Sequence, residues 1–483
     1  MFVPVMKFGG TSVGDGAAIR RVVEIVRSEI ARGSAPVVVV SAMSGVTDRL
    51  LTLAREAAAG DRESVQKGLD ELSARHLDTV RQLLTPSRKE VLDAAIRAQF
   101  EELRSVLSAL AILREASPRS LDGIAAVGEL LSSRAVAAAL EEAGVRAAWI
   151  DARRVIVTDD TYMSAAPLFE QTRDATAREV IPILEAGVVP VLGGYIGATE
   201  GGITTTLGRG GSDYSASMIG AALHDAARST SHDARSTSHV ARSTWQLATH
   251  IWTDVDGMLT ADPRVIDSPR VVPQISFGEA SELAYFGAKV LHPSTILPAV
   301  ERDIPVRILN SRRPEAPGTL ITADPVPSGQ ALAAIACKRR ITVIEVISTR
   351  MLMAHGFLRR LFEVFERHRT AVDVVTTSEV SVSVTVDDDR QLQHIVRELQ
   401  EFSDVVVEPD MALLCAVGDN LRIDPRLAVR LLTSLEGFPL RMVSQAASRR
   451  NLTVVLHESD LPGAMARLHQ VWLAEPEAVA EKA

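Results

Sequence analysis

The sequence predicts an α/β protein in which a mainly parallel sheet is sandwiched by helices and is followed by two smaller α+β units of the ferredoxin-like type. Two observations carry this prediction. Through the first half, short apolar runs such as residues 3–8 and 36–41 alternate with segments of helical periodicity, such as residues 17–31. In the last third the order of elements changes to strand, helix, two strands, helix and strand, and then begins again.

Each element of the first half follows from its local pattern. Residues 36–41 are Pro-Val-Val-Val-Val-Ser, which is apolar on both faces, as a buried parallel strand must be. Residues 17–31 repeat their apolar positions at helical spacing, and a long stretch rich in Ala, Leu, Glu and Arg predicts helices over 48–115. Further strands are expected at 147–150 and 188–192, with helices between them. This alternation predicts a sheet covered by helices on both faces.

The tail contains the repeated unit. Pro325 and its polar neighbours predict a linker behind a first domain that spans residues 1–323. The two ferredoxin-like units are expected over 331–410 and 411–475. The second copy reaches its last helix without a last strand. Residues 332–337 could supply that strand, which would interleave the two units.

Charge and cysteine usage exclude several classes of protein. The formal net charge is −9 and no basic block stands out, so binding to nucleic acid or to an anionic membrane is not expected. No apolar run is long enough to cross a bilayer. Cys337 and Cys415 lie far apart and make no metal-ligand spacing. We interpret them as buried, reduced thiols of a cytoplasmic protein.

Residues 227–244 form a low-complexity segment. The unit Ala-Arg-Ser-Thr-Ser-His recurs with a period of seven residues, but no apolar seam accompanies it, so a coiled coil is not expected. His232 and His239 could suggest a metal site, although no carboxylate or thiolate ligand joins them nearby. We predict a solvated surface loop here.

Two glycine-rich motifs point to phosphate and carboxylate chemistry. The first is Lys-Phe-Gly-Gly-Thr-Ser-Val at 7–13, behind the first strand, where glycine N–H groups can approach a phosphate and a lysine adds positive charge. The Walker A pattern is absent, because this lysine precedes the glycines. The second motif is Gly-Arg-Gly-Gly-Ser-Asp-Tyr at 208–214, in which an arginine can fork onto a substrate carboxylate and a helix begins. A simple helix cap is the structural alternative for Ser212 and Asp213.

A third set of motifs distinguishes between a general phosphate-binding protein and a member of one particular family. It comprises Thr-Asp-Val-Asp-Gly at 253–257, Asp-Pro-Arg at 262–264 and Gly-Ala-Lys-Val-Leu-His-Pro at 287–293. Taken singly, these are turns and caps. In this order and at these distances, the motifs resemble the aspartate kinases, a family within the amino-acid kinase superfamily. The resemblance covers nearly the whole chain, through residues 7–13, 39–47, 128–129, 208–214, 253–257, 277–293 and 372–382.

The resemblance implies an activity. An aspartate kinase transfers a phosphoryl group from ATP to the β-carboxylate of L-aspartate, giving ADP and 4-phospho-L-aspartate, the first step toward lysine, threonine and methionine. The tail resembles the paired ACT domains with which this family senses end-product amino acids. Such domains pair between subunits, so a homodimer or homotetramer is expected. Magnesium, held largely by phosphate oxygens and water, would accompany the nucleotide.

The resemblance also implies roles for individual residues. Lys7 would lie between the γ-phosphoryl group and the attacking carboxylate, Asp213 would orient it, and Gly9 and Gly10 would offer N–H groups to the phosphoryl group. The amino-acid pocket would consist of Ser41, Thr47, Glu129, Arg209 and Ser212, with Glu129 on the α-ammonium and Arg209 on a carboxylate. The nucleotide site would be lined by Lys7, Thr253, Asp254, Leu259, Arg264 and Lys289. Leu259 departs from the family, because many relatives place an aromatic residue there.

A further set of residues resembles the lysine-sensing surface of the lysine-inhibited subgroup. These residues are Met351, Gly356, Phe357, Leu358, Val372, Asp373, Ser378 and Glu379. An amino-acid effector needs carboxylates for its ammonium groups and N–H groups for its carboxylate, which Asp373, Glu379 and the helix start at Gly356 could provide. An ACT fold whose effector site is altered or empty is the alternative.

Two other functions are weighed against an aspartate kinase. Glutamate and acetylglutamate kinases share the glycine chemistry, but they generally lack the paired ACT tail and the run at 286–293. A catalytically inactive amino-acid sensor is the second alternative. The presence of Lys7, Glu129, Arg209 and Asp213 argues against it.

Overall fold

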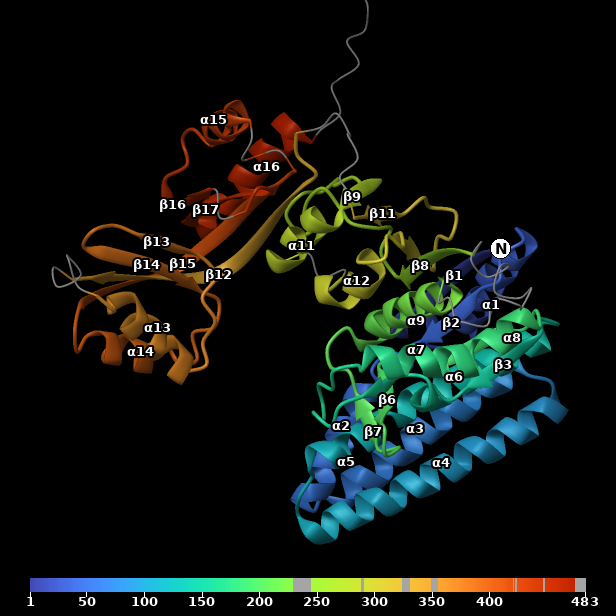
Figure 1. Cartoon of the computed structure of the whole chain (residues 1–483). Helices are drawn as coiled ribbons and strands as arrows, with labels where there is room; N and C mark the ends of the chain where they lie inside the picture. Colours follow the sequence, from blue (N-terminus) through green and yellow to red (C-terminus); the bar gives the residue numbers. More distant parts are fainter. Residues whose placement is uncertain are drawn as a thin grey trace, which may run out of the picture. The chain divides into compact units, whose positions relative to one another are not determined.

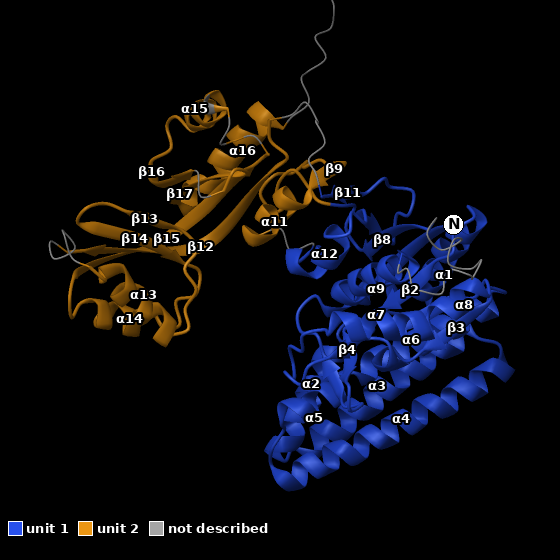
Figure 2. Cartoon of the chain, in the orientation of Figure 1, with its two compact units in different colours: residues 1–257, 291–323 blue, residues 258–290, 324–483 orange. Residues whose placement is uncertain are grey.

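The structure is a computed structural model of the whole chain, and it describes residues 1–228, 245–287, 291–323, 331–348, 355–419, 421, 424–445 and 448–473 (Figure 1). The chain divides into two compact units (Figure 2). Unit 1 comprises Met1–Gly257 and Leu291–Ala323, and unit 2 comprises Met258–Val290 and Asp324–Ala483. The low-complexity repeat lies outside the described residues from 229 onward, as does the predicted linker at Pro325.

Unit 1 is built on a mainly parallel sheet with the strand order β3-β5-β2-β1-β8-β10-β11. Its neighbouring pairs are parallel except for β10 and β11, which are antiparallel. The strands are β1 (Phe2–Phe8), β2 (Val37–Val40), β3 (Ala147–Ile150), β5 (Val189–Gly193), β8 (Gln246–Thr253), β10 (Val306–Asn310) and β11 (Thr319–Thr322). A second, small sheet has the order β4-β6-β7, with β4 (Val157–Thr158), β6 (Ile196–Thr199) and β7 (Thr204–Thr206).

Helices cover both faces of the main sheet. On one face Met6 and Phe8 of β1 join a buried hydrophobic cluster with residues of α1, α2, α3, α4 and α6. On the other face α9 packs so closely that a Cβ at Gly220 would lie 3.3 Å from the Thr249 hydroxyl oxygen of β8. The helices of unit 1 are α1 (Gly16–Ala31), α2 (Val46–Ala59), α3 (Arg62–Leu83), α4 (Pro86–Leu113), α5 (Pro118–Ala125), α6 (Val127–Glu142), α7 (Phe169–Glu179), α8 (Ile181–Glu185), α9 (Gly211–Arg228) and α12 (Pro293–Val300), with the 3-10 turns η1 (Gly10–Val13) and η2 (Ala152–Arg154).

The parallel strands of unit 1 end at one edge of the sheet. Because β1, β2, β5, β8 and β10 run in the same direction, the residues that follow them lie close together. In contrast to the expectation from the sequence, one stretch among the described residues, Pro118–Glu142, is long and apolar enough to cross a membrane by composition, and 83% of its most apolar window is buried inside the protein. Such burial is typical of a core helix.

Unit 2 contains an antiparallel sheet with the order β13-β14-β12-β15-β17-β16. Strands β12 and β15 are long enough to belong to both halves of this sheet. In one half residues 334–338 of β12 pair with 413–417 of β15, and in the other half residues 341–347 pair with 404–411. Separate hydrophobic clusters lie beneath the halves, one around Ile344 and one around Leu414. The elements are β12 (Ala334–Ile347), α13 (Phe357–Arg367), β13 (Val375–Thr377), β14 (Ser381–Val386), α14 (Leu392–Leu399), β15 (Asp404–Val417), α15 (Pro425–Ser434), β16 (Leu440–Gln445), β17 (Asn451–His457), η4 (Glu458–Asp460) and α16 (Leu461–Trp472).

Unit 2 also contains a segment from the middle of the chain, residues 258–287, with β9 (Gln274–Ser276) and α11 (Phe277–Tyr285). Hydrogen bonds attach it to the tail. The Thr260 carbonyl accepts from the Ile335 N–H at 2.8 Å, and the Thr260 hydroxyl lies 3.0 Å from His469 Nε2. The Asn451 side chain donates to Glu282 at 2.7 Å. Residues 258–287 are therefore part of the same compact body as the C-terminal sheet.

The predicted fold class is confirmed. Unit 1 has the mainly parallel, helix-covered sheet, and unit 2 has the two α+β halves. Antiparallel pairing through β12 and β15 joins these halves into one sheet, because each strand is long enough to serve both.

Candidate functional site

The centre of the site is an ion pair between Lys7 and Asp213. Lys7 lies near the end of β1, and Asp213 lies in the first turn of α9. The Lys7 ammonium is 2.6 Å from Asp213 Oδ1, and the two side chains are 11% and 12% exposed. This pairing fixes the ammonium at the edge where the parallel strands end, while it leaves a small opening toward solvent. A polyanion that approaches this edge meets a positioned positive charge.

The two glycines behind Lys7 are used differently. The Gly9 N–H donates to the Trp252 carbonyl at 3.0 Å, so it is engaged within the protein. A Cβ at Gly9 would lie 3.6 Å from the Lys7 ammonium. A Cβ at Gly10 would lie 2.9 Å from the Ala42 carbonyl oxygen, which is too close for any side chain. Gly9 therefore lies against β8 and Gly10 against the loop that follows β2, and of these two glycines only Gly10 remains as a candidate N–H donor for a phosphoryl group.

Serines connect the start of α9 to the end of β2. The Ser41 hydroxyl donates to the Ser212 hydroxyl at 2.9 Å, and the Ser132 hydroxyl of α6 donates to the Ser41 carbonyl at 2.8 Å. Ser41 follows β2, and Ser212 precedes Asp213. A connected set of bonds therefore runs from the ion pair to α6.

Glu129 lies at the end of this set, in the first turn of α6. Its Oε1 accepts from the Ala42 N–H at 3.1 Å, and its Oε2 is buried without a hydrogen-bond partner among the described residues. Burial raises the pKa of the Glu129 carboxyl to about 8, although the hydrogen bond from Ala42 acts in the opposite direction. A buried carboxyl with an unused oxygen is a strong candidate to receive a ligand's ammonium group.

Arg209 and Thr47 are held less tightly. Arg209 is exposed, and it stands between Gly208 and Gly210, whose φ values of 73° favour glycine. Thr47 is half-buried at the start of α2. The loop before Arg209 is anchored by buried Asp122, which accepts from the Thr206 hydroxyl of β7 at 2.6 Å. The anchor sets the position of the backbone at 208–210, while the Arg209 side chain stays available for a ligand.

The predicted nucleotide residues are distributed over both units. Thr253, half-buried at the end of β8, and Asp254, exposed, lie in unit 1, and the Thr253 hydroxyl donates to Asp254 at 3.3 Å. Leu259 and Arg264 belong to unit 2, where Arg264 is paired with Asp262 at 2.6 Å. Lys289 lies outside the described residues.

The predicted effector residues all belong to unit 2, and Met351 among them lies outside the described residues. Gly356, with φ of 86°, caps the start of α13, where Phe357 and Leu358 follow. Val372 and Asp373 precede β13, while Ser378 and Glu379 form the exposed turn between β13 and β14. Asp373 is the most constrained member, with a side chain that is 5% exposed and paired with Lys338 at 2.7 Å.

Some residues at the edge where the parallel strands of unit 1 end were not predicted from the sequence. A Cβ at Gly193 would lie 3.1 Å from Glu129, and a Cβ at Gly194 would lie 2.7 Å from Ser212. These two glycines allow β5 to end against α6 and α9. A Gly-Gly pair directly behind a predicted strand was the available signal, as it was at Gly9. The Ser12–Ser311 hydroxyl pair, 2.8 Å apart, had no such signal.

Comparisons with known proteins show which families and proteins this chain is similar to. Residues 3–226 and 239–310 match the model of the amino acid kinase family, and residues 414–471 match an ACT domain. The lysine-sensitive aspartokinase 3 of Escherichia coli is 35% identical over 480 residues, which is 97% of this chain and 98% of that protein. Aspartokinase 1 of Arabidopsis thaliana chloroplasts is 36% identical, over 96% of this chain and 79% of its own length. The chain belongs to the aspartokinases.

Solved aspartokinase structures agree with this membership. Escherichia coli aspartokinase III in complex with lysine and aspartate, in the T-state, superposes with a TM-score of 0.80 at 33% identity, covering 98% of this chain and all of that one. The same enzyme with aspartate and ADP, in the R-state, gives a TM-score of 0.76 at 34% identity, with 97% and 99% covered. The predicted family is confirmed.

Proposed function

We propose that the chain transfers a phosphoryl group from ATP to the side-chain carboxylate of L-aspartate, with Lys7 as the charge at the reaction centre. The observation that supports this assignment is a chain of contacts at the edge of the sheet. It begins at the Lys7–Asp213 ion pair and continues through Ser212, next to Asp213, and its hydrogen bond with Ser41. Further hydrogen bonds link this loop to the first turn of α6, which carries Glu129. A carboxylate nucleophile is already ionised near neutral pH and needs no general base. Catalysis then depends on positioning and on positive charge at the transferring group.

The substrate groups have matching partners. The Glu129 carboxylate would receive the α-ammonium group of aspartate, since its Oε2 is buried and unpartnered. Exposed Arg209 would bind a substrate carboxylate by two parallel hydrogen bonds. Ser41, Thr47 and Ser212 would line the pocket between them. Asp213 would hold the Lys7 ammonium in place, and the Gly10 N–H would face the phosphoryl group.

The nucleotide would be held by Thr253 and Asp254 of unit 1, with Leu259, Arg264 and Lys289 supplying further contacts. No three His, Cys, Asp or Glu side chains converge among the described residues. Asp213, the carboxylate nearest the reaction centre, is already paired with Lys7. These residues fit a Mg²⁺ ion bound through phosphate oxygens and water, where it would neutralise phosphate charge. Asp254 is an exposed carboxylate that could contact one of its waters.

The proposal is tested by measuring ADP release with aspartate, glutamate and acetylglutamate as acceptors, each with and without lysine or threonine. We expect turnover with aspartate alone and inhibition by lysine. Turnover with glutamate or acetylglutamate instead would identify a different amino-acid kinase. A chain that binds amino acids but releases no ADP with any acceptor would be a sensor, and the catalytic assignment would be wrong.

Arg209→Ala should raise the KM for aspartate by about 10- to 100-fold and leave the KM for ATP nearly unchanged, because a charged hydrogen-bond fork to the substrate is lost. Initial rates with each substrate varied in turn measure both constants. Arg209→Lys should recover only part of the affinity. Arg97→Ala, on the exposed face of α4, is the matched control. Equal increases in both constants would place Arg209 at the nucleotide instead.

We propose lysine as the feedback effector, bound by the residues around Asp373. Asp373→Ala should shift the lysine response to concentrations at least about tenfold higher, because a side-chain ammonium loses hydration on binding and needs an anionic partner. Inhibition curves, each normalised to the rate without lysine, measure the shift. The control is Asp404→Ala, an exposed carboxylate at the start of β15. An enzyme that ignores millimolar lysine but responds to threonine would contradict the effector assignment.

The remaining proposals concern the cellular location of the enzyme and its oligomeric state. We propose a cytoplasmic enzyme, in keeping with the two free cysteines, Cys337 and Cys415. We also propose a homodimer or homotetramer that associates through the ACT domains. Size-exclusion chromatography with light scattering, with and without lysine, tests the assembly.

A further inference from the structure

Asp373 already holds an ammonium group of the chain itself. Lys338 of β12 places its Nζ 2.7 Å from Asp373 Oδ1, and the lysine side chain is only 19% exposed. The second carboxylate oxygen, Asp373 Oδ2, is buried and has no hydrogen-bond partner among the described residues. Oδ1 is thus satisfied by an internal lysine, while Oδ2 retains capacity for another donor. An incoming ammonium group would meet Lys338 at the same carboxylate.

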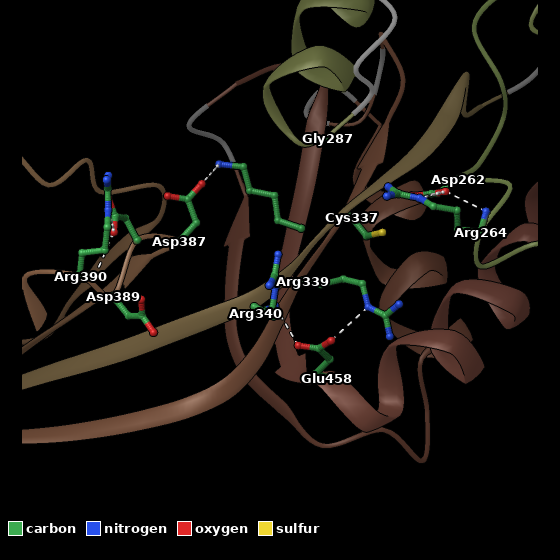
Figure 3. Close-up of a pocket in the computed structure, with 12 residues that line it drawn as sticks. Asp262, Arg264, Gly287, Cys337, Arg339, Arg340, Asp387, Asp389, Arg390 and Glu458 are labelled. Atoms are coloured by element: carbon green, nitrogen blue, oxygen red, sulfur yellow. Dashed lines mark hydrogen bonds and ion pairs between the residues drawn. The ribbon is translucent and has the colours of Figure 1, made fainter. Parts of the chain in front are cut away.

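Lys338 already contacts a second carboxylate. Its Nζ is also 3.1 Å from Asp387 Oδ2, and the Asp387 side chain is 45% exposed. Both residues line a cavity of about 710 Å³ within unit 2, whose wall carries Asp387 together with Arg339 and Glu458 (Figure 3). The pKa of Lys338 lies above its ordinary value: burial lowers it, but the bonds to Asp373 and Asp387 outweigh that effect. A Lys338 ammonium that lost Asp373 would still have the Asp387 carboxylate as its partner at the cavity wall.

Asp373 also contacts the segment from the middle of the chain. The Tyr285 hydroxyl donates to Asp373 Oδ1 at 3.2 Å, and the Lys338 ammonium lies 5.0 Å from the centre of the Tyr285 ring. Tyr285 is the last residue of α11. Two residues later, Gly287 has φ of 126° and approaches β12 so closely that a Cβ there would lie 2.5 Å from the Cys337 carbonyl oxygen. The end of α11 is therefore fitted against the strand that carries Lys338.

The position of Tyr285 matters because of the segment to which it belongs. Residues 258–287 carry Leu259 and Arg264, two of the residues proposed for the nucleotide, yet they form one compact unit with the C-terminal sheet. A change at Asp373 can reach this segment through the Tyr285 hydroxyl without leaving unit 2.

We propose that Lys338 is a built-in competitor for the effector's ammonium group at Asp373, and that Tyr285 transmits the exchange to α11. The proposal rests on the effector role proposed above for Asp373. In the absence of effector, Lys338 and Tyr285 share Asp373 Oδ1. Binding of a free lysine replaces the contact of Lys338 with Asp373, leaves that ammonium on Asp387 alone and alters the hydrogen bond from Tyr285. Lys338 thus sets the lysine concentration that binding requires, and Tyr285 sets how strongly bound lysine inhibits the enzyme.

The competitor is tested with Lys338→Met, which removes the ammonium but keeps an unbranched apolar stem. Isothermal titration of the full-length enzyme should show lysine binding at least about tenfold more tightly than to wild type, because a charged competitor is gone and Asp373 is left without its partner. Lys338→Arg, which keeps the charge, should stay near wild type. L-Norleucine, which has the same chain length but no side-chain ammonium, should gain nothing from Lys338→Met. An equal gain for norleucine, or no gain for lysine, would overturn the competition.

The transmission is tested separately with Tyr285→Phe, which removes only the hydroxyl. Lysine should bind this variant with nearly wild-type affinity by calorimetry, while the maximal inhibition at saturating lysine falls markedly. Tyr162→Phe, in unit 1, is the matched control. Full inhibition of Tyr285→Phe would remove Tyr285 from the coupling.

The outcomes also separate this proposal from the effector assignment on which it rests. If lysine binds neither wild type nor Lys338→Met, the effector assignment and the competitor both fail. If wild type binds lysine and Lys338→Met gains no affinity, the effector assignment stands and only the competitor fails. If lysine binds Lys338→Met but not wild type, Lys338 competes so strongly that it excludes the effector, and the competition is supported.

Discussion

Replacing Lys7 with alanine is expected to lower kcat by about 10²–10³-fold, because it removes a positioned positive charge from the transferring phosphoryl group. The Lys7 side chain is 11% exposed, so its charge acts in a site where water screens it weakly. Single-turnover measurements at saturating ATP and aspartate report this step directly. The KM values should change much less than kcat. A loss smaller than about tenfold would contradict the assigned role.

Stability has to be separated from chemistry in this test. Lys7→Ala leaves the Asp213 carboxylate, 12% exposed, without its partner at 2.6 Å, and a loss of melting temperature is expected from that alone. The double variant Lys7→Ala/Asp213→Ala removes both charges and should recover part of the melting temperature but none of the activity. Lys67→Ala, an exposed lysine on α3, is the control for a lysine lost elsewhere.

The parallel sheet of unit 1 was predictable because its strands are apolar on both faces. Residues 37–40 are four consecutive valines, all fully buried, and no amphipathic surface strand has that pattern. Glycines directly behind such strands then marked the edge where the site forms. Lys7 and Asp213 are more than 200 positions apart, and their pairing follows from the topology that brings β1 and the start of α9 together.

Other features depend on tertiary contacts that no local pattern reveals. Residues 258–287 look like a continuation of the first domain, and the family model continues through them to residue 310. In the structure they pack with the C-terminal sheet, through side chains such as Thr260 and Glu282, whose partners lie about 170 to 210 positions further along the chain. Asp373 presents the same difficulty. The sequence suggested a carboxylate open to an effector, whereas the fold pairs it with Lys338.

Predicted roles and observed contacts agree to different degrees within the site. Asp213 was predicted to orient Lys7, and the two are in contact at 2.6 Å. Gly9 was predicted as an N–H donor to phosphate, yet its N–H is engaged by the Trp252 carbonyl. The difference has a physical reason: β1 and β8 are adjacent parallel strands, and their ladder extends one residue further than the sequence pattern indicates.

Replacing Glu129 with glutamine is expected to raise the KM for aspartate by about 10- to 100-fold, because a buried hydrogen bond to a charged group contributes about 1.5–3 kcal/mol. Glutamine keeps the size of the side chain and an acceptor for the Ala42 N–H, so the fold should persist. The matched control is Glu24→Gln, an exposed residue of α1. An unchanged KM would make Glu129 a structural residue.

The pH dependence of Glu129→Gln gives the sharper result. Burial raises the pKa of Glu129 from 4.5 to about 8, so the folded protein binds more protons than the unfolded chain between those values. The free energy of unfolding should therefore fall as pH rises through this range, and the glutamine variant should lose that slope.

Aspartate, whose ammonium group requires the ionised carboxylate, should bind wild type more tightly as pH rises from 6 toward 8, with release of a proton. In Glu129→Gln the KM for aspartate should be high and independent of pH over the same range. Calorimetric titrations in buffers of different ionisation enthalpy count the released proton. A wild-type enzyme that releases none would show that Glu129 is already ionised, and would contradict the predicted burial effect.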